Sequence, residues 1–156
     1  EAYENMVLGF HHTEMTGDKK LLDKNHMLKH TSDRMDEYDI RPRNPKLLAS
    51  SFSGGNQQKI VVARELYKNP KLLIVGEPTR GVDVGAIEFI HKQLIELRDQ
   101  GCAIISVSVE LDEILGLSDR ILVMNKGQEV STVNGDEANP KDLGLMMAGI
   151  SQGVSN

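Results

Sequence analysis

The second half of the chain alternates between short apolar runs and stretches with helical spacing. Apolar runs at 72–75, 103–107 and 121–124 have the length of strands. Between them, at 87–97 and 111–115, apolar side chains recur at steps of three and four residues, which predicts helices. Continuous apolar runs are typical of parallel strands that are buried on both faces. This order predicts an α/β fold with a parallel sheet and flanking helices.

The end of the chain carries different signals. The tripeptide Asn-Lys-Gly at 125–127 separates the third run from a further strand-like stretch at 129–133, and this pattern predicts a hairpin of antiparallel strands. Pro140 follows Asn139, a good helix cap, and the two residues predict the start of a last helix. Residues 151–156 form a polar tail.

The first part of the chain is poorer in apolar residues, which are scattered among charged ones. This pattern predicts short amphipathic helices on a surface. Pro42 and Pro45 keep their surroundings out of helix and indicate a joint between subdomains. We therefore predict a helical subdomain portion at 1–45, a motif and its helix at 46–68, the C-terminal half of an α/β core at 69–150, and a tail at 151–156.

Composition narrows the class of protein. The chain has 156 residues, of which 39% are apolar and 26% charged, as in globular domains. A net charge of −5 disfavours nucleic acid as a partner. No run approaches the roughly 20 apolar residues that span a bilayer, and the start does not resemble a secretory signal. We expect a cytoplasmic protein in which Cys102, within an apolar stretch, is a buried thiol.

Histidines raise the question of a metal site. His26 and His30 lie four residues apart on a predicted helix, and His11 and His12 are adjacent. A tetrahedral site needs further Cys or carboxylate ligands, and none is firmly placed. We therefore expect no metal, and histidines on a solvated surface. Methionines are expected as core fillers or subdomain contacts rather than as a cofactor box, at positions 6, 15, 27, 35, 146 and 147.

Two neighbouring segments carry candidate chemistry. Ser-Gly-Gly-Asn-Gln-Gln-Lys at 53–59 precedes a periodic helix, where free N–H groups and a positive dipole end could dock a phosphate. An ordinary Ser-capped helix after a glycine turn explains these residues equally well. Thirteen residues after Lys59 begins the first apolar run, which ends in Gly-Glu-Pro-Thr at 76–79. A carboxylate at a strand end is where nucleotide hydrolases hold a general base.

The order and spacing of these segments resemble ATP-binding cassette (ABC) ATPases. The family signature Leu-Ser-Gly-Gly-Gln corresponds to Phe-Ser-Gly-Gly-Asn at 52–56. Asn-Gln-Gln-Lys at 56–59 and Arg-Gly-Val-Asp-Val-Gly-Ala at 80–86 look like the second cassette of sugar and nucleoside importers. The resemblance covers 3–149. It implies the C-terminal portion of a cassette: an incomplete P-loop NTPase (RecA-like) parallel sheet with flanking helices, and an α-helical subdomain.

The resemblance implies that the signature serves a nucleotide on another cassette. In this family the nucleotide is sandwiched between two cassettes. Ser53, Gly54 and Gly55 would then contact the γ-phosphate of an ATP held by the opposite cassette. Asn56 and Gln57 complete this predicted ATP-binding set, which acts in trans.

The remaining matches and departures concern hydrolysis. The resemblance implies that Glu77 is the catalytic glutamate that polarises the attacking water, and that Asp83 belongs to the loop crossing the cassette interface. Gly76 replaces the aspartate expected to assist Mg²⁺, and Val109 replaces the histidine expected at the γ-phosphate. No Gly-x-x-x-x-Gly-Lys-Ser/Thr loop occurs in the chain.

These departures predict no ATPase activity for the chain alone, because losing one phosphate-stabilising donor costs on the order of 3 kcal/mol. In the full-length assembly we expect ATP and Mg²⁺ as cofactors, with a second cassette and transmembrane permease subunits as partners at the inner face of the membrane. We also expect the isolated piece to self-associate or to leave parts disordered, because the family's central strand beside 72–75 is missing.

Two alternatives to this importer subunit remain open. The chain could be a half-cassette that acts without hydrolysis, as a regulatory or assembly module. It could also belong to a soluble cassette ATPase of DNA repair or translation, which the acidic balance and the segment at 80–86 disfavour.

Overall fold

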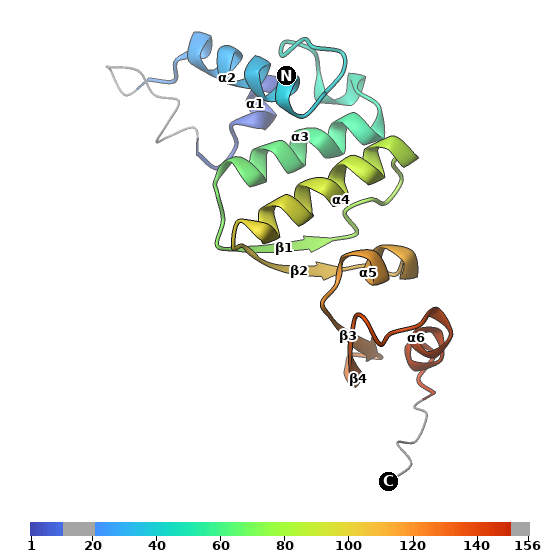
Figure 1. Cartoon of the computed structure of the whole chain (residues 1–156). Helices are drawn as coiled ribbons and strands as arrows, with labels where there is room; N and C mark the ends of the chain where they lie inside the picture. Colours follow the sequence, from blue (N-terminus) through green and yellow to red (C-terminus); the bar gives the residue numbers. More distant parts are fainter. Residues whose placement is uncertain (11–20, 151–156) are drawn as a thin grey trace. The chain divides into compact units, whose positions relative to one another are not determined.

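The computed structural model describes residues 1–10 and 21–150, which form two compact units (Figure 1). Unit 1 comprises Glu1–Ile74 and Pro78–Ile105, and unit 2 comprises Val75–Glu77 and the chain from Ser106 on. His11, His12, Met15 and the predicted tail lie outside the described residues. The elements are α1 (Ala2–Met6), α2 (Lys24–Glu37), the 3-10 helix η1 (Ala49–Ser51), α3 (Gly54–Tyr67), β1 (Leu72–Gly76), α4 (Val84–Asp99), β2 (Ala103–Val107), α5 (Leu111–Leu117), β3 (Arg120–Asn125), β4 (Gln128–Asn134) and α6 (Pro140–Met147).

Strands β1 and β2 form a two-stranded parallel sheet, as the sequence predicts. At one end the Ala103 N–H donates to the Lys71 carbonyl at 3.0 Å, and at the other the Glu77 N–H donates to the Val107 carbonyl at 2.8 Å. Both strands therefore run in the same direction. A parallel pair needs a long crossover, which α4 provides, running along the sheet in Figure 1.

The helices of unit 1 pack in two clusters of buried apolar residues. Helix α3 contacts both α1 and α4. The first turn of the chain is also tied to the loop before α3, because the Ala2 N–H donates to the Leu47 carbonyl at 2.8 Å. Methionines lie in both clusters, as expected. The larger cluster comprises Ala2, Met6, Met35, Tyr38, Ile40, Phe52, Ile60 and Ala63, and the smaller one comprises Tyr3, Val7, Phe10 and Met27.

The expectation of a solvated histidine is wrong for His30. Its side chain is buried, and its ring lies 4.5 Å from the Tyr67 ring and 5.5 Å from the Phe10 ring, centroid to centroid. The periodicity of α2 explains this burial, because His30 shares a helical face with buried Met27, three residues earlier. His26, in contrast, is exposed.

The strands of the parallel sheet are not buried on both faces, so this expectation is also wrong. Leu72 and Ile74 of β1 are 52% and 68% exposed, and Ile105 of β2 is 51% exposed. Alternate residues Leu73 and Ile104 are partly covered. Because side chains alternate along a strand, Leu72, Ile74 and Ile105 are exposed where no described element of unit 1 covers them.

Unit 2 contains the predicted hairpin, but β3 does not join the parallel sheet. It pairs with β4 in antiparallel register, with Ile121 opposite Val133. Lys126 and Gly127 form the turn with φ of 48° and 77°, and two left-handed residues suit a tight hairpin. The backbone hydrogen bonds of β3 are made with β4, so the prediction that β3 belongs to the same layer as β1 and β2 is wrong.

The last helix begins as the sequence predicts. The Asn139 side chain accepts a hydrogen bond from the Asp142 N–H at 2.9 Å, and Pro140 occupies the first turn. Leu143 of α6 packs against the inward residues of β3, Ile121 and Val123, with Met146 and Met147 beside them. Leu111, Ile114 and Leu115 of α5 pack against the same cluster, so the core of unit 2 is a hairpin covered by α5 and α6.

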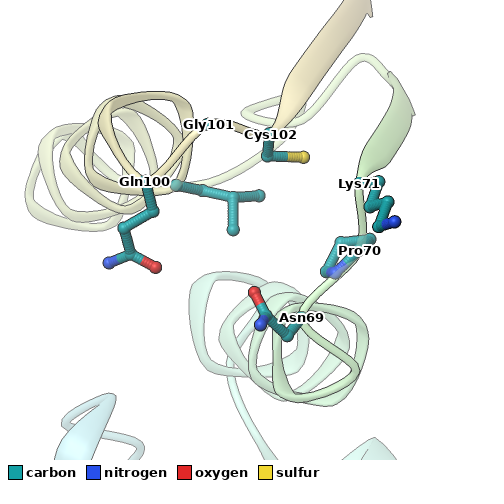
Figure 2. Close-up of a pocket in the computed structure, with 7 residues that line it drawn as sticks. Asn69, Pro70, Lys71, Gln100, Gly101 and Cys102 are labelled. Carbon is teal, nitrogen blue, oxygen red and sulfur yellow. The ribbon is translucent and has the colours of Figure 1, made fainter.

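Cys102 is buried, as expected, at the start of β2. It lines a small pocket of about 180 Å³ together with Asn69, Pro70, Lys71 and the end of α4, and the lining residues are drawn in Figure 2. No described helix is both long and apolar enough to cross a bilayer.

Candidate functional site

Ser53 forms the N-cap of α3 and remains exposed to solvent. Its Oγ accepts a hydrogen bond from the Asn56 backbone N–H at 3.4 Å and another from the Asn56 Nδ2 at 2.9 Å. The serine thus satisfies one of the free N–H groups that open every helix. The cap that the sequence predicts is confirmed.

The glycines after Ser53 permit a close approach between two segments of unit 1. A Cβ on Gly54 would lie 3.2 Å from the Gly81 carbonyl oxygen. A Cβ on Gly55 would lie 2.9 Å from Asp83 Oδ2 and 3.0 Å from the Cβ of Ala86. Side chains at these positions would collide with their neighbours. The turn at residues 52–56, which carries the family signature and is called the signature turn below, therefore packs directly against the segment that leads into α4.

Asp83 caps α4 as Ser53 caps α3. Its Oδ1 accepts a hydrogen bond from the Ala86 N–H at 2.9 Å. The starts of α3 and α4 consequently lie side by side, and each helix start carries a partial positive charge. The structure thus brings together Ser53, Gly54, Gly55 and Asp83, which the sequence placed in two separate motifs.

Two glutamines anchor this arrangement. Gln57, predicted to contact ATP, donates from Nε2 to the Phe52 carbonyl at 2.8 Å and so braces the signature turn. Gln58 donates from Nε2 to the Pro78 carbonyl at 2.9 Å and ties α3 to the loop after β1. Sequence reasoning missed Gln58, because no local pattern points to a bond between residues 20 positions apart.

The other predicted residues lie in unit 2, at the carboxyl ends of β1 and β2. Glu77 is half-buried, and its φ of 48° lies in the left-handed region, where non-glycine residues are uncommon. Such strain concentrates at functional sites. Next to it, a Cβ on Gly76 would meet no atom within 4 Å, and Val109 is 63% exposed.

Within the described residues, no group of three or more His, Cys, Asp or Glu side chains could hold a metal ion. Gly76 has no side-chain oxygen, so Glu77 is the one carboxylate at the end of β1. A Mg²⁺ ion usually keeps several waters and takes one or two carboxylates plus phosphate oxygens. At this strand end Glu77 could therefore supply one carboxylate to a Mg²⁺ ion, and phosphate oxygens and waters would have to supply the other ligands.

Solved structures share the fold of this chain. One solved structure, an ATP-binding cassette of an ABC transporter, matches 96% of this chain with a TM-score of 0.72 at 22% identity, and the chain covers 61% of it. A nucleotide-free ATP-binding cassette from an ABC transporter matches 90% with a TM-score of 0.69, also at 22% identity and with 60% of it covered. The chain has the fold of an ATP-binding cassette.

Sequence comparison adds the family. The sequence profile of the family described as ABC transporter matches residues 2–80. This chain belongs to that family.

Individual relatives are more similar in sequence than the solved structures. The nucleoside import ATP-binding protein NupA of Lactococcus lactis subsp. cremoris is 47% identical over 94% of this chain. The guanosine import ATP-binding protein NupO of Bacillus subtilis is 46% identical over 96% of it. The ribose import ATP-binding protein RbsA of Clostridium perfringens is 42% identical over 85% of it. The chain spans 29%, 29% and 26% of their respective lengths.

Proposed function

We propose that this chain is the signature-bearing part of the second cassette in an ABC importer subunit for nucleosides or sugars. In this proposal it completes an ATP site whose nucleotide is gripped by another cassette. The names of the relatives, which import nucleosides, guanosine or ribose, support the solute class. The departures from the family's hydrolytic pattern at Gly76 and Val109 support a role in trans.

The observation that carries the proposal is the pair of helix starts joined at the signature turn. Ser53 is exposed at the head of α3, and Gly54 and Gly55 leave the turn without side chains. Helix N-termini with free N–H groups bind anions, and phosphate is the anion that the family would present. Asn56 and Gln57 hold the turn, while Asp83 at the adjoining helix start faces the second cassette.

Hydrolysis in the proposed assembly is asymmetric. The site completed by Ser53 is competent, because the opposite cassette supplies the lysine loop. The site around Glu77 is degenerate, since Gly76 lacks a magnesium ligand and Val109 lacks a hydrogen-bond donor. The Mg²⁺ of the competent site is held by groups outside this chain. Glu77 keeps the position of the general base, and the chain alone has no ATPase activity.

The membrane partner in this proposal is a permease that docks near the first two helices. Leu8 is 48% exposed, and Leu21 and Leu22 are 70% and 51% exposed. Exposed apolar residues that gather on one surface commonly mark a protein interface. Docking there would hold the subunit at the inner face of the membrane.

The test compares two substitutions in the intact subunit assembled with its permease. Ser53→Ala removes the proposed donor to the γ-phosphate and is expected to lower ATP turnover about a hundredfold or more. Glu77→Gln affects only the degenerate site and is expected to lower turnover less. Ser51→Ala, an exposed serine two residues earlier, is the matched control and should leave turnover unchanged.

A larger loss from Glu77→Gln than from Ser53→Ala would contradict this assignment. If Ser53→Ala left ATP turnover intact but abolished transport, the non-hydrolysing regulatory module would be favoured instead.

A further inference from the structure

The side chain of Asn56 joins the signature turn to a second segment of unit 1. Its Oδ1 accepts a hydrogen bond from the Arg41 backbone N–H at 2.7 Å, while its Nδ2 donates to Ser53 Oγ at 2.9 Å. A backbone N–H can only donate, so the amide oxygen has to face Arg41. This fixes the orientation of the amide and leaves the N–H₂ group facing the serine.

The loop segment around Arg41, which donates a hydrogen bond to Asn56, is itself held in place by other interactions. The Arg41 side chain pairs with Asp39, with Nε 2.8 Å from the carboxylate Oδ1, and the Lys59 Nζ donates to the Asp39 carbonyl at 3.1 Å. The Arg41 guanidinium also holds the pKa of the Asp39 carboxyl below its usual value, against a smaller opposing effect of burial. Asn56 is therefore oriented by a braced loop.

The two bonds from Asn56 determine what the Ser53 hydroxyl can still do. A serine oxygen has two acceptor positions and one O–H donor. Both acceptor positions are engaged, by the backbone N–H and by the Nδ2 of the same residue. Within residues 1–10 and 21–150, the Ser53 hydroxyl donates no hydrogen bond, and the residue is exposed. The hydroxyl can therefore still donate one hydrogen bond, toward a group outside the chain.

We infer that Asn56 is a positioning residue that sets the Ser53 hydroxyl as a hydrogen-bond donor toward the γ-phosphate. This inference rests on the proposed function, because it needs the phosphate to meet Ser53. A phosphate oxygen accepts hydrogen bonds. A serine whose O–H already points outward is therefore oriented to donate to that oxygen before ATP binds. No rotation of the hydroxyl is then needed when ATP arrives.

The residue type at 56 suits this role. The chain has Asn where the family signature has Gln. A side chain that is one methylene shorter keeps its amide within the first turn of α3, against the serine three residues before it. The departure from the family signature thus coincides with the bond that orients Ser53.

The first test measures the geometry alone and uses the chain without nucleotide. Amide hydrogen exchange followed by NMR reports whether the Arg41 N–H is bonded. Asn56→Ala is expected to speed exchange at Arg41 by about tenfold or more, whereas Ser53→Ala should not. Asn44→Ala serves as the matched control, because Asn44 also accepts a bond from a loop backbone, the Lys46 N–H at 3.1 Å, but does not contact Ser53.

The second test measures ATP turnover of the intact subunit in a double-mutant cycle. Asn56→Ala is expected to lower turnover about tenfold to a hundredfold, in the range expected for misplacing a reacting contact. In the Ser53→Ala background, the same substitution should lower turnover less than twofold further, because Asn56 acts through Ser53. Asn44→Ala should leave turnover unchanged in both backgrounds.

The outcomes separate this inference from the proposed function. If Ser53→Ala lowers turnover but Asn56→Ala does not, or if Asn56→Ala costs as much in the Ser53→Ala background as in the wild-type background, the inference is overturned and the proposed function stands. If Ser53→Ala itself leaves turnover unchanged, the proposed function fails. Unchanged exchange at Arg41 in Asn56→Ala would overturn the geometry on which the inference depends.

Discussion

Single atoms decide where the chain can tolerate a side chain. Gly55 has no room for a Cβ because Asp83 and Ala86 lie against it, whereas Gly76 is open and has no left-handed backbone. Gly81 is also open, but its φ of 72° disfavours any residue with a Cβ. Three alanine substitutions therefore separate packing from backbone strain.

Gly55→Ala is expected to lower the free energy of unfolding by about 1–3 kcal/mol, because the new methyl group pushes on the Asp83 carboxylate that caps α4. Gly81→Ala should cost about 1–2 kcal/mol through strain alone. Gly76→Ala should be neutral or stabilising by up to about 1 kcal/mol. Urea unfolding of the three variants measures these differences. A Gly76→Ala variant as unstable as Gly55→Ala would contradict the account.

At the residue scale, some features of the structure could be predicted from the sequence and others could not. Ser53, Asn139 and Cys102 are predictable because caps and apolar stretches are local signals. The burial of His30 was not predictable, because it depends on aromatic rings from two other segments. The hydrogen bond between Asn56 and Arg41 could not be predicted from the sequence either, because it joins a helix to a loop 15 positions away.

At the scale of elements, the contact between α2 and α4 contains a titratable group. Tyr38 ends α2, is buried, and stacks edge-on against Phe89 of α4 with ring centroids 5.9 Å apart. Burial raises the pKa of the Tyr38 phenol, and the neighbouring Glu37 carboxylate raises it further. The unfolded chain therefore loses this proton at a lower pH than the folded chain does.

This linkage predicts a loss of stability in alkali. The stabilisation from the raised pKa of Tyr38 is complete below the unfolded value of about 10, and it is lost as pH rises from there through the folded pKa. Tyr38→Phe removes the ionising group, so the variant should lose less unfolding free energy between pH 9 and about pH 11 than the wild type. Parallel curves for both proteins, measured by urea unfolding at each pH, would contradict this explanation.

The elements themselves were largely predictable. Helix α4 follows from the spacing of Ile90, Leu94 and Leu97, and the hairpin follows from its turn residues. Strand partners were harder to predict, because a short apolar run such as that of β3 suits either a parallel or an antiparallel neighbour. Periodicity gives the type of an element, while its partner depends on contacts that are distant in sequence.

At the scale of the whole molecule, the bare face of the β1–β2 sheet has a consequence in solution. Leu72, Ile74 and Ile105 expose apolar surface next to unpaired strand edges, and both features favour association with other chains. The isolated chain is therefore expected to self-associate, as the sequence also predicts. In the proposed subunit, other segments of the cassette would cover this face.

Ile74→Lys places a charge on this face and should shift the chain toward the monomer, because a charged side chain resists burial. Val61→Lys is the control, since Val61 is also exposed, at 40%, but lies on α3. Sedimentation velocity over a range of concentrations measures the mass of each variant. A wild-type chain that stays monomeric at every concentration would refute the expectation.

The central claim is that the turn at Ser53 contacts the terminal phosphate of a nucleotide gripped by another cassette. The most direct measurement is an experimental structure of the intact subunit with a non-hydrolysable ATP analogue. The account predicts that Ser53 Oγ lies about 2.5–3.0 Å from a γ-phosphate oxygen. A structure in which this turn faces away from the triphosphate, or is buried where no anion can reach it, would contradict the account.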